Sequence, residues 1–299
     1  MKQYRTLFIL SAVLLGPATG CAQQQPVKDF VPAISHPLFE QGQGPILLVD
    51  GGHNNFHTAD ERFAPFAKVA TSEGFVVKDI REEINAKQLE DAGILVIANA
   101  LNEKNVDSWQ QPVLPAFTPE EINHISNWVW NGGSLFLVAD HMPFAGAAAS
   151  LAERFGFTFH DGFALCKPKK KFDIFCYANG MLRHSQLTDT HRPLDSIVTF
   201  TGQAFTIPDS AISVITLDSA YKVLLPEVAW EFNNEMKIIP AEGMSQLAYT
   251  GFGKGKVVVA GEAAMFTAQR VGDNKIGLNS DFAPNNLQLL RNILEWLAE

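Results

Sequence analysis

The chain has 299 residues, of which 46% are hydrophobic and 18% are charged, and its formal net charge at pH 7 is −9. This negative charge argues against a nucleic-acid partner and against binding to an anionic membrane surface. Beyond the amino terminus, no apolar run is long enough to cross a membrane, which predicts a soluble mature protein.

The amino terminus is typical of an exported lipoprotein. Two basic residues precede an apolar run over residues 7–15, and small residues lead to Cys21. This order predicts a lipoprotein signal peptide over residues 1–20, with Cys21 as the lipidation site and residues 21–44 as a lipid-anchored tether. Plain export without lipidation is the alternative.

Lipidation would place the protein in the periplasm, in contact with the membrane only through its lipid anchor. The glutamines that follow Cys21 offer no acidic retention signal and favour the outer membrane. The other two cysteines, Cys166 and Cys176, form an even pair in an oxidising compartment, which predicts a disulfide around the basic segment 167–171. Two reduced core thiols, or one reactive thiol, are the alternatives.

From residue 45 the chain alternates between apolar runs and amphipathic segments, the pattern of parallel strands joined by helices. The first predicted strand, residues 46–50, runs into a loop over residues 51–57. Thr58 and Glu61 have the spacing of a capping box, which predicts a helix from there to Gly74.

Further elements follow in the same alternation. Strands are predicted over residues 75–80, 94–98 and 134–139. Between the last two, Thr118, Pro119 and Glu121 predict the start of a helix that ends near Asn131. Another helix is predicted over residues 147–155.

The pattern changes to short β-like pieces between residues 160 and 224, which we interpret as an antiparallel insertion or edge section. A strand over 256–260 and a helix over 285–298 close the chain. The predicted fold class is α/β, a flavodoxin-like three-layer fold with a mostly parallel sheet and this β-rich section, in one domain over residues 45–299.

Ionisable residues stand where three predicted strands end. Asp50, Asp140 and Glu262 are candidate catalytic carboxylates, each with a turn, cap or salt-bridge role as its structural alternative. Because ligands bind outside the carboxyl ends of parallel strands, we expect these groups to converge on one pocket.

Histidines and amides accompany these carboxylates. Imidazoles are common metal ligands, and they are offered here by His53, His57 and His141. Loop amides that could orient a polar ligand, although such amides more often satisfy turns, are Asn54, Asn55, Gln269 and Asn279. Trp109 is a candidate platform for a sugar or peptide, against a packing role.

Four segments carry a family resemblance: ILLVDGGHNN, NGGSLFLVAD, GKGKVVVAGEAAMF and NNLQLLRNILEWL. They resemble the class I glutamine amidotransferase-like superfamily, and within it bacterial envelope proteins related to the ThuA-like and gliding-transport-associated branches. Catalytic members carry a nucleophilic cysteine after the strand that SLFLVA matches. Asp140 and His141 stand there in this chain, so the resemblance implies the fold without amidotransferase activity.

Three functions remain open from the sequence. The domain could bind a small polar ligand, such as a glycan or peptide fragment, or an envelope protein partner, without catalysis. It could be a hydrolase in which a divalent metal such as zinc activates water, held by some of the histidines and carboxylates above. It could also be a metal-free acid–base enzyme acting on sugars.

Overall fold

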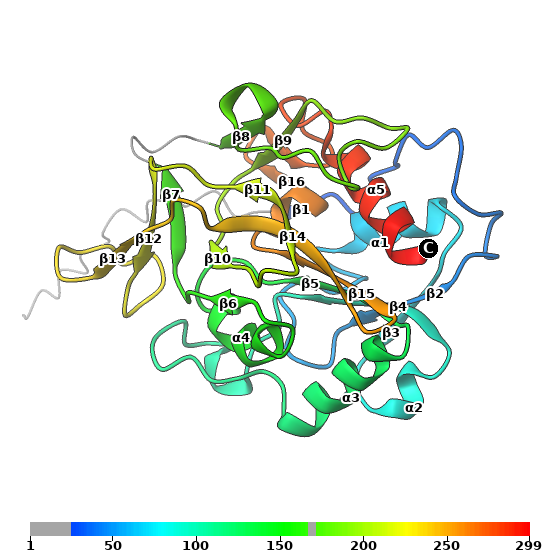
Figure 1. The fold of residues 1–299 in the computed structure, drawn as a ribbon, viewed down its shortest axis with the longest axis horizontal. Coiled ribbons are helices and arrows are strands. Elements are labelled where there is room, and N and C mark those ends of the chain that lie inside the picture. The colour runs from blue at the N-terminus through cyan, green and yellow to red at the C-terminus, as the bar shows by residue number, and fades with distance from the viewer. Residues whose placement is uncertain (1–24, 167–171) are drawn as a thin grey trace, which may run out of the picture.

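The computed structural model describes residues 25–166 and 172–299. It is an α/β protein organised around a nine-stranded mixed sheet (Figure 1). The parallel strands are β2 (Ile46–Asp50), β3 (Val76–Ile80), β4 (Ala92–Ala98), β5 (Ser134–Val138) and β15 (Gly255–Ala260). They stand in the order β3-β2-β4-β5-β15, which confirms the predicted parallel core within a sheet that is mixed overall.

Antiparallel strands extend the sheet beyond β15. They are β14 (Ser245–Phe252), β10 (Phe205–Thr206), β6 (Thr158–Phe159) and β11 (Ile212–Thr216). Three smaller sheets accompany it. The first contains β7 (Phe163–Cys166), β12 (Tyr221–Leu225) and β13 (Lys237–Pro240), and the second contains β8 (Asp173–Cys176) and β9 (Ser196–Thr199). The third contains β1 (Gln25–Pro26), β16 (Ala268–Val271) and β17 (Asn274–Gly277). The antiparallel character expected for residues 160–224 is thereby confirmed.

Helices cover both faces of the parallel strands (Figure 1). One face packs on α1 (Ala64–Ser72) and α5 (Asn286–Ala298), and the other on α2 (Ala86–Leu89), α3 (Pro119–Trp130) and α4 (Phe144–Arg154). Successive side chains of a strand point to opposite faces, so in β4 Val96 joins the α1 and α5 core while Leu95 joins the other. Short 3₁₀ turns are η1 (Glu103–Asn105), η2 (Tyr177–Asn179) and η3 (Ala264–Phe266).

Two predicted helix starts have different outcomes. Helix α3 begins as expected, with Thr118 as its cap and Glu121 completing the capping box. The predicted start of α1 is wrong: α1 begins only at Ala64, and the Thr58 hydroxyl donates to Asp60 instead of forming a box. Proline is tolerated in the first turn of a helix and breaks its interior, so Pro65 requires the late start.

Residues from Gln25 onward lie against the domain. Strand β1 pairs with β16, and Val27, Phe30 and Leu38 pack on the core beside α1 and α5. The predicted signal peptide and Cys21 lie outside the described residues. None of the helices in the described ranges is long and apolar enough to span a membrane.

The predicted disulfide is not formed. Cys166 closes β7, where it stands opposite Tyr221 of β12, and Cys176 closes β8, opposite Ser196 of β9. The two strands belong to different small sheets, and no bond joins the two sulfur atoms, so the expected disulfide is corrected.

Candidate functional site

A cavity of about 250 Å³ lies where β4, β5 and β15 end. Each strand supplies a polar residue just past its carboxyl end: Asn99 after β4, Asp140 after β5 and Glu262 after β15. The other residues that line the cavity are Phe56, His57, Trp109, His141, Phe144, Phe200, Thr201, Trp230, Ala264 and Gln269. Of the residues expected to converge at this rim, His57, Asp140, His141 and Glu262 line the cavity, and Gln269, predicted separately as a ligand-binding amide, lines it too.

The β-rich part of the chain completes the cavity. Phe200 and Thr201 follow β9, and Trp230 lies in the connection between β12 and β13. That connection is bound to the loop that carries Trp109, because the Ala229 amide donates to the Trp109 carbonyl at 2.8 Å. Polar groups of the parallel sheet thus face aromatic side chains from residues far away in the sequence.

Asn99 holds the cavity floor together. Its backbone is left-handed, with φ of 50°, a conformation that asparagine tolerates better than most residues. The side-chain Oδ1 accepts the Asp140 amide at 2.8 Å, and Nδ2 lies 3.0 Å from Nδ1 of His57. Since Oδ1 is committed as an acceptor, Nδ2 donates, and neutral His57 carries its proton on Nε2.

His57 is neutral at pH 7. Burial, the positive charge of Arg62 and that of His141 together lower the pKa of His57 to about 3. Burial and neighbouring positive charges both favour the uncharged form of an imidazole. His57 can therefore offer a hydrogen-bond donor to a ligand without adding charge to the cavity.

Asp140 and Glu262 form a pair of buried acids. Burial raises the pKa of Asp140, and the His141 charge and backbone N–H groups offset part of that rise. Burial also raises the pKa of Glu262 well above its usual value, and the negative charge of Asp140 raises it further. Although Glu262 accepts the amides of Ala264 and Met265, at 3.1 and 2.7 Å, two like charges resist sharing one apolar site. The pair therefore favours holding a proton.

His141 is held between aromatic rings. Its Nδ1 donates to the Met142 carbonyl at 2.7 Å, and its ring stacks on Phe163 with centroids 4.5 Å apart. The Trp230 ring meets it edge-on at 4.7 Å. These contacts fix one orientation for the imidazole in the cavity wall.

Gln269 presents a hydrogen-bond acceptor that no described residue satisfies. The side chain is 1% exposed, and its Oε1 has no partner within the described ranges. The Thr267 hydroxyl donates to the Ala264 carbonyl, so it accepts from Nε2 of Gln269, which fixes the amide with Oε1 unused. A buried unpaired acceptor costs roughly 1–3 kcal/mol, so a ligand that donates to it would recover that cost.

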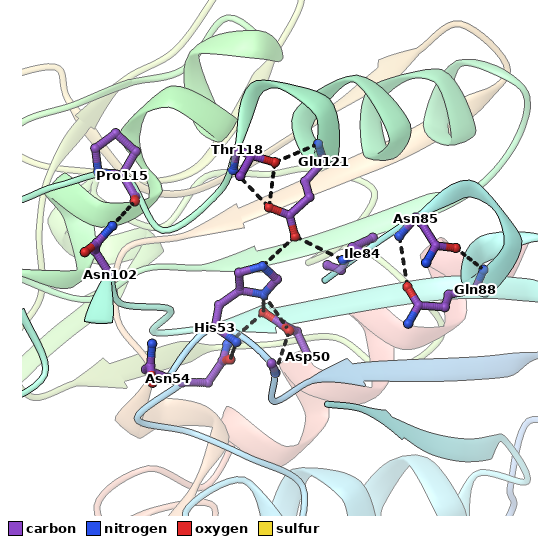
Figure 2. Close-up of polar contacts among 12 residues, drawn as sticks. Asp50, His53, Asn54, Ile84, Asn85, Gln88, Asn102, Pro115, Thr118 and Glu121 are labelled. Carbon is purple, nitrogen blue, oxygen red and sulfur yellow. Dashed lines mark hydrogen bonds and ion pairs between the residues drawn. The ribbon is translucent and has the colours of Figure 1, made fainter. Parts of the chain in front are cut away.

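Asp50 and His53 lie in a separate buried network (Figure 2). The His53 ring bridges two carboxylates: Nδ1 lies 2.9 Å from Asp50 and Nε2 lies 2.7 Å from Glu121. Burial lowers the pKa of His53, but hydrogen bonds and charges from both acids outweigh it and raise the pKa to about 9. The same contact helps lower the pKa of Glu121 to about 2, against its own burial. This ion triad ties the loop after β2 to α3.

The predicted ligand-binding amides other than Gln269 do not line the cavity. Asn55 braces the β2 loop through Asp50 and the Ala98 carbonyl. Asn54 is exposed, in a left-handed conformation with φ of 47°. Asn279 lies behind Gln269, donating weakly to its carbonyl at 3.4 Å, with its own Oδ1 unpaired among the described residues.

The three histidines proposed as metal ligands are divided: His57 and His141 line the cavity, whereas His53 lies between Asp50 and Glu121. His53 uses both nitrogens on carboxylates, and His57 and His141 each use Nδ1 on a protein partner. In the part of the chain that the structure describes, no three His, Cys, Asp or Glu side chains are placed to share a metal ion.

Sequence reasoning missed Asn99, Glu121 and Trp230. Asn99 directly follows the predicted strand 94–98, so the rule that selects Asp140 and Glu262 could have selected it. For Glu121 the sequence indicates only a capping role, and nothing local reveals that its free oxygen meets His53. Trp230 has no signal, because its place in the cavity depends on the pairing of two distant loops.

Replacing Gly202 by alanine is expected to displace the Phe200 and Thr201 wall. A Cβ atom at Gly202 would lie 2.2 Å from the Gly261 carbonyl and 3.0 Å from Cβ of Glu262. Overpacking of this kind costs about 1–3 kcal/mol, which urea unfolding would measure. The control is Gly251→Ala, whose added methyl has its nearest neighbour at 4.0 Å; equal stability of the two variants would contradict this assignment.

No family model matches the sequence, and no curated protein matches it as a relative. Among solved structures, the mmIFT52 N-terminal domain superposes with a TM-score of 0.61 at 13% identity, over 85% of this chain and 97% of that domain. A protein described as ThuA-like, from Bacteroides uniformis, gives 0.46 at 11% identity over 87% and 94%. One described as a GMP synthase component, from Thermoplasma acidophilum, gives 0.47 at 9% over 86% and 95%. The first of these likenesses shows a shared fold.

Proposed function

We propose that this protein binds a small, neutral, polyhydroxylated ligand, a sugar or glycan fragment, in the cavity at the ends of β4, β5 and β15. The observation that carries this proposal is Gln269, which lines the cavity and whose buried Oε1 has no hydrogen-bond partner among the described residues. A sugar hydroxyl is a donor of the required kind. The neighbouring carboxyl groups offer further acceptors and donors within the same cavity.

The charge of the cavity supports a neutral ligand. His57 is uncharged at pH 7, and the buried acid pair favours retaining a proton. A strongly charged ligand would need a compensating charge that this pair does not supply in full. Hydroxyl groups need only hydrogen-bond partners, which these side chains provide.

The aromatic walls support a ligand with apolar faces. Trp109 packs edge-on against Phe144, with ring centroids 5.2 Å apart, and both line the cavity. Trp230 is 47% exposed and has φ of 71°, a strained conformation for a bulky residue. Such strain is often stored at binding sites, and the C–H face of a sugar ring packs well on indole.

A metal-dependent hydrolase receives less support. His57, Asp140, His141 and Glu262 line the cavity, but among the described residues no three His, Cys, Asp or Glu side chains are placed to share a metal ion. Amidotransferase activity is also not part of the proposal, since neither described cysteine lines the cavity. If the five parallel strands are numbered by their order along the chain, the sheet order β3-β2-β4-β5-β15 becomes 2-1-3-4-5. This is the order of flavodoxin-like folds, and it supports such a fold and membership of the amidotransferase-like superfamily. Lipidation at Cys21, and a periplasmic place for the domain, complete the proposal.

The test is a calorimetric screen of mono- and disaccharides and short peptides against the wild type and Gln269→Leu. We expect one saccharide class to bind, and the variant to weaken it by roughly tenfold, the loss of one buried hydrogen bond. The control is Asn54→Gly, which keeps the left-handed backbone outside the cavity and should bind normally. Binding of peptides but of no saccharide would contradict the proposal.

A further inference from the structure

A second cavity shares a wall with the first. It has a volume of about 260 Å³, and both cavities are lined by Phe200 and Thr201. The hairpin of β16 and β17 also connects them: Gln269 of β16 lines the first cavity, while Val271 and Ile276 line the second. A ligand seated on Gln269 therefore has the second cavity as its neighbour.

The second cavity differs from the first in chemistry. Its wall is largely apolar, with Phe172 and Phe282 stacked at a centroid distance of 5.3 Å and with Val271 and Ile276 beside them. Among the described residues, no histidine and no carboxylate lines it. Phe282 is 62% exposed, so an apolar ligand group seated on its ring would remove apolar surface from water.

The volume is sufficient for an aromatic ring, because an apolar cavity of about 150 Å³ already accepts benzene. A second sugar ring would require hydrogen-bond partners on several sides, whereas five of the nine lining residues are apolar; the polar ones are Thr201, Asn274, Lys275 and Ser280. An aryl or short alkyl group fits this lining better.

We infer that the ligand is a glycoside, with its sugar in the first cavity and an apolar aglycone between Phe200 and the Phe172–Phe282 pair. This inference rests on the proposed function and names its ligand class. The shared wall determines how the glycoside would lie. Its sugar would contact Gln269 in the first cavity, and its aglycone would extend past Phe200 and Thr201 into the second cavity.

The experiment compares methyl and phenyl glycosides of glucose, galactose and N-acetylglucosamine by calorimetry. Burial of a phenyl ring is expected to tighten binding at least about tenfold over the methyl glycoside of the same sugar. Phe282→Ser should abolish this gain and leave methyl glycoside affinity unchanged. Ile212→Ser, at an exposed apolar residue that is 46% accessible and outside both cavities, is the matched control.

The outcomes separate the two proposals. Equal affinity for methyl and phenyl glycosides, or an unchanged phenyl gain in Phe282→Ser, would overturn the glycoside inference and leave sugar binding intact. Absence of binding to every saccharide and glycoside would overturn the proposed function, and the inference with it. Two results together would support both the sugar-binding function and the glycoside inference. Phe282→Ser would lose the tighter binding of the phenyl glycoside, and Gln269→Leu would bind both the methyl and the phenyl glycoside more weakly.

Discussion

The stability of the protein should fall as the pH rises from 6 to 9.5, and much of that fall should disappear in His53→Gln. The pKa of His53 is raised from 6.5 to about 9 in the folded state. Its contribution is therefore fully present below pH 6.5 and is lost as the pH rises through 9. A rise of this size corresponds to about 3 kcal/mol.

The substitution itself should be severe at pH 6. Glutamine cannot supply a positive charge, so Asp50 and Glu121 would remain as two buried carboxylates without their cation. Removing one partner of a buried ion pair costs about 3–5 kcal/mol. The loss should shrink toward pH 9.5, where wild-type His53 is also uncharged.

Urea unfolding at pH 6 and pH 9.5 measures both effects. The acids of the cavity also change protonation over this range and contribute to the pH dependence of both proteins. The contribution of His53 is therefore the difference between the free energies of unfolding of wild type and variant at each pH. His124→Gln is the matched control, because His124 lies near the surface of α3 with its ring 3.7 Å from Glu120. A loss in His53→Gln that is the same at both pH values would show that the imidazole is not charged in the folded protein.

Asp140→Asn should make the protein more stable at pH 8 and bind the proposed saccharide more weakly. The folded state raises the pKa of Asp140 and of Glu262, so the folded protein holds protons that the unfolded chain releases. Stability therefore falls as the pH rises above the unfolded values near 4. Asparagine removes one charge of the pair and keeps an oxygen for the His141 amide, which Asp140 Oδ1 accepts at 2.8 Å.

The expected gain is roughly 1–2 kcal/mol at pH 8 and close to none at pH 4, because asparagine removes a buried like charge that is costly only at the higher pH. The expected loss of saccharide affinity is about tenfold or more, since a hydrogen bond to a charged group is worth roughly 1.5–3 kcal/mol. Thermal unfolding at the two pH values and calorimetry measure these changes. Asp60→Asn, at an exposed acid paired with Arg81, is the control. A variant that is destabilised equally at both pH values would contradict the shared-proton account of the acid pair.

Sequence periodicity determined the parallel core. Apolar runs such as residues 46–50 and 134–138 are buried on both faces, which only a covered sheet allows, so their pattern predicts the fold without knowledge of contacts. A capping box is also a local signal, and it predicts a helix start correctly where no nearby residue disfavours the helix: Thr118 and Glu121 start α3 as predicted. At Thr58 the same signal failed because Pro65 excluded an early helix.

The sequence by itself also placed Asp140, His141 and Glu262 near one cavity, since the ends of parallel strands must meet at one edge. Only the tertiary structure separated Asp50 and His53 from that cavity, because Glu121, 68 positions from His53, captures the imidazole. It alone brought Trp230 to the cavity, through loop pairing that no local pattern records. The parallel arrangement of strands follows from their alternation with helices along the chain, whereas the partner of a buried charge depends on which distant side chain the tertiary fold places beside it.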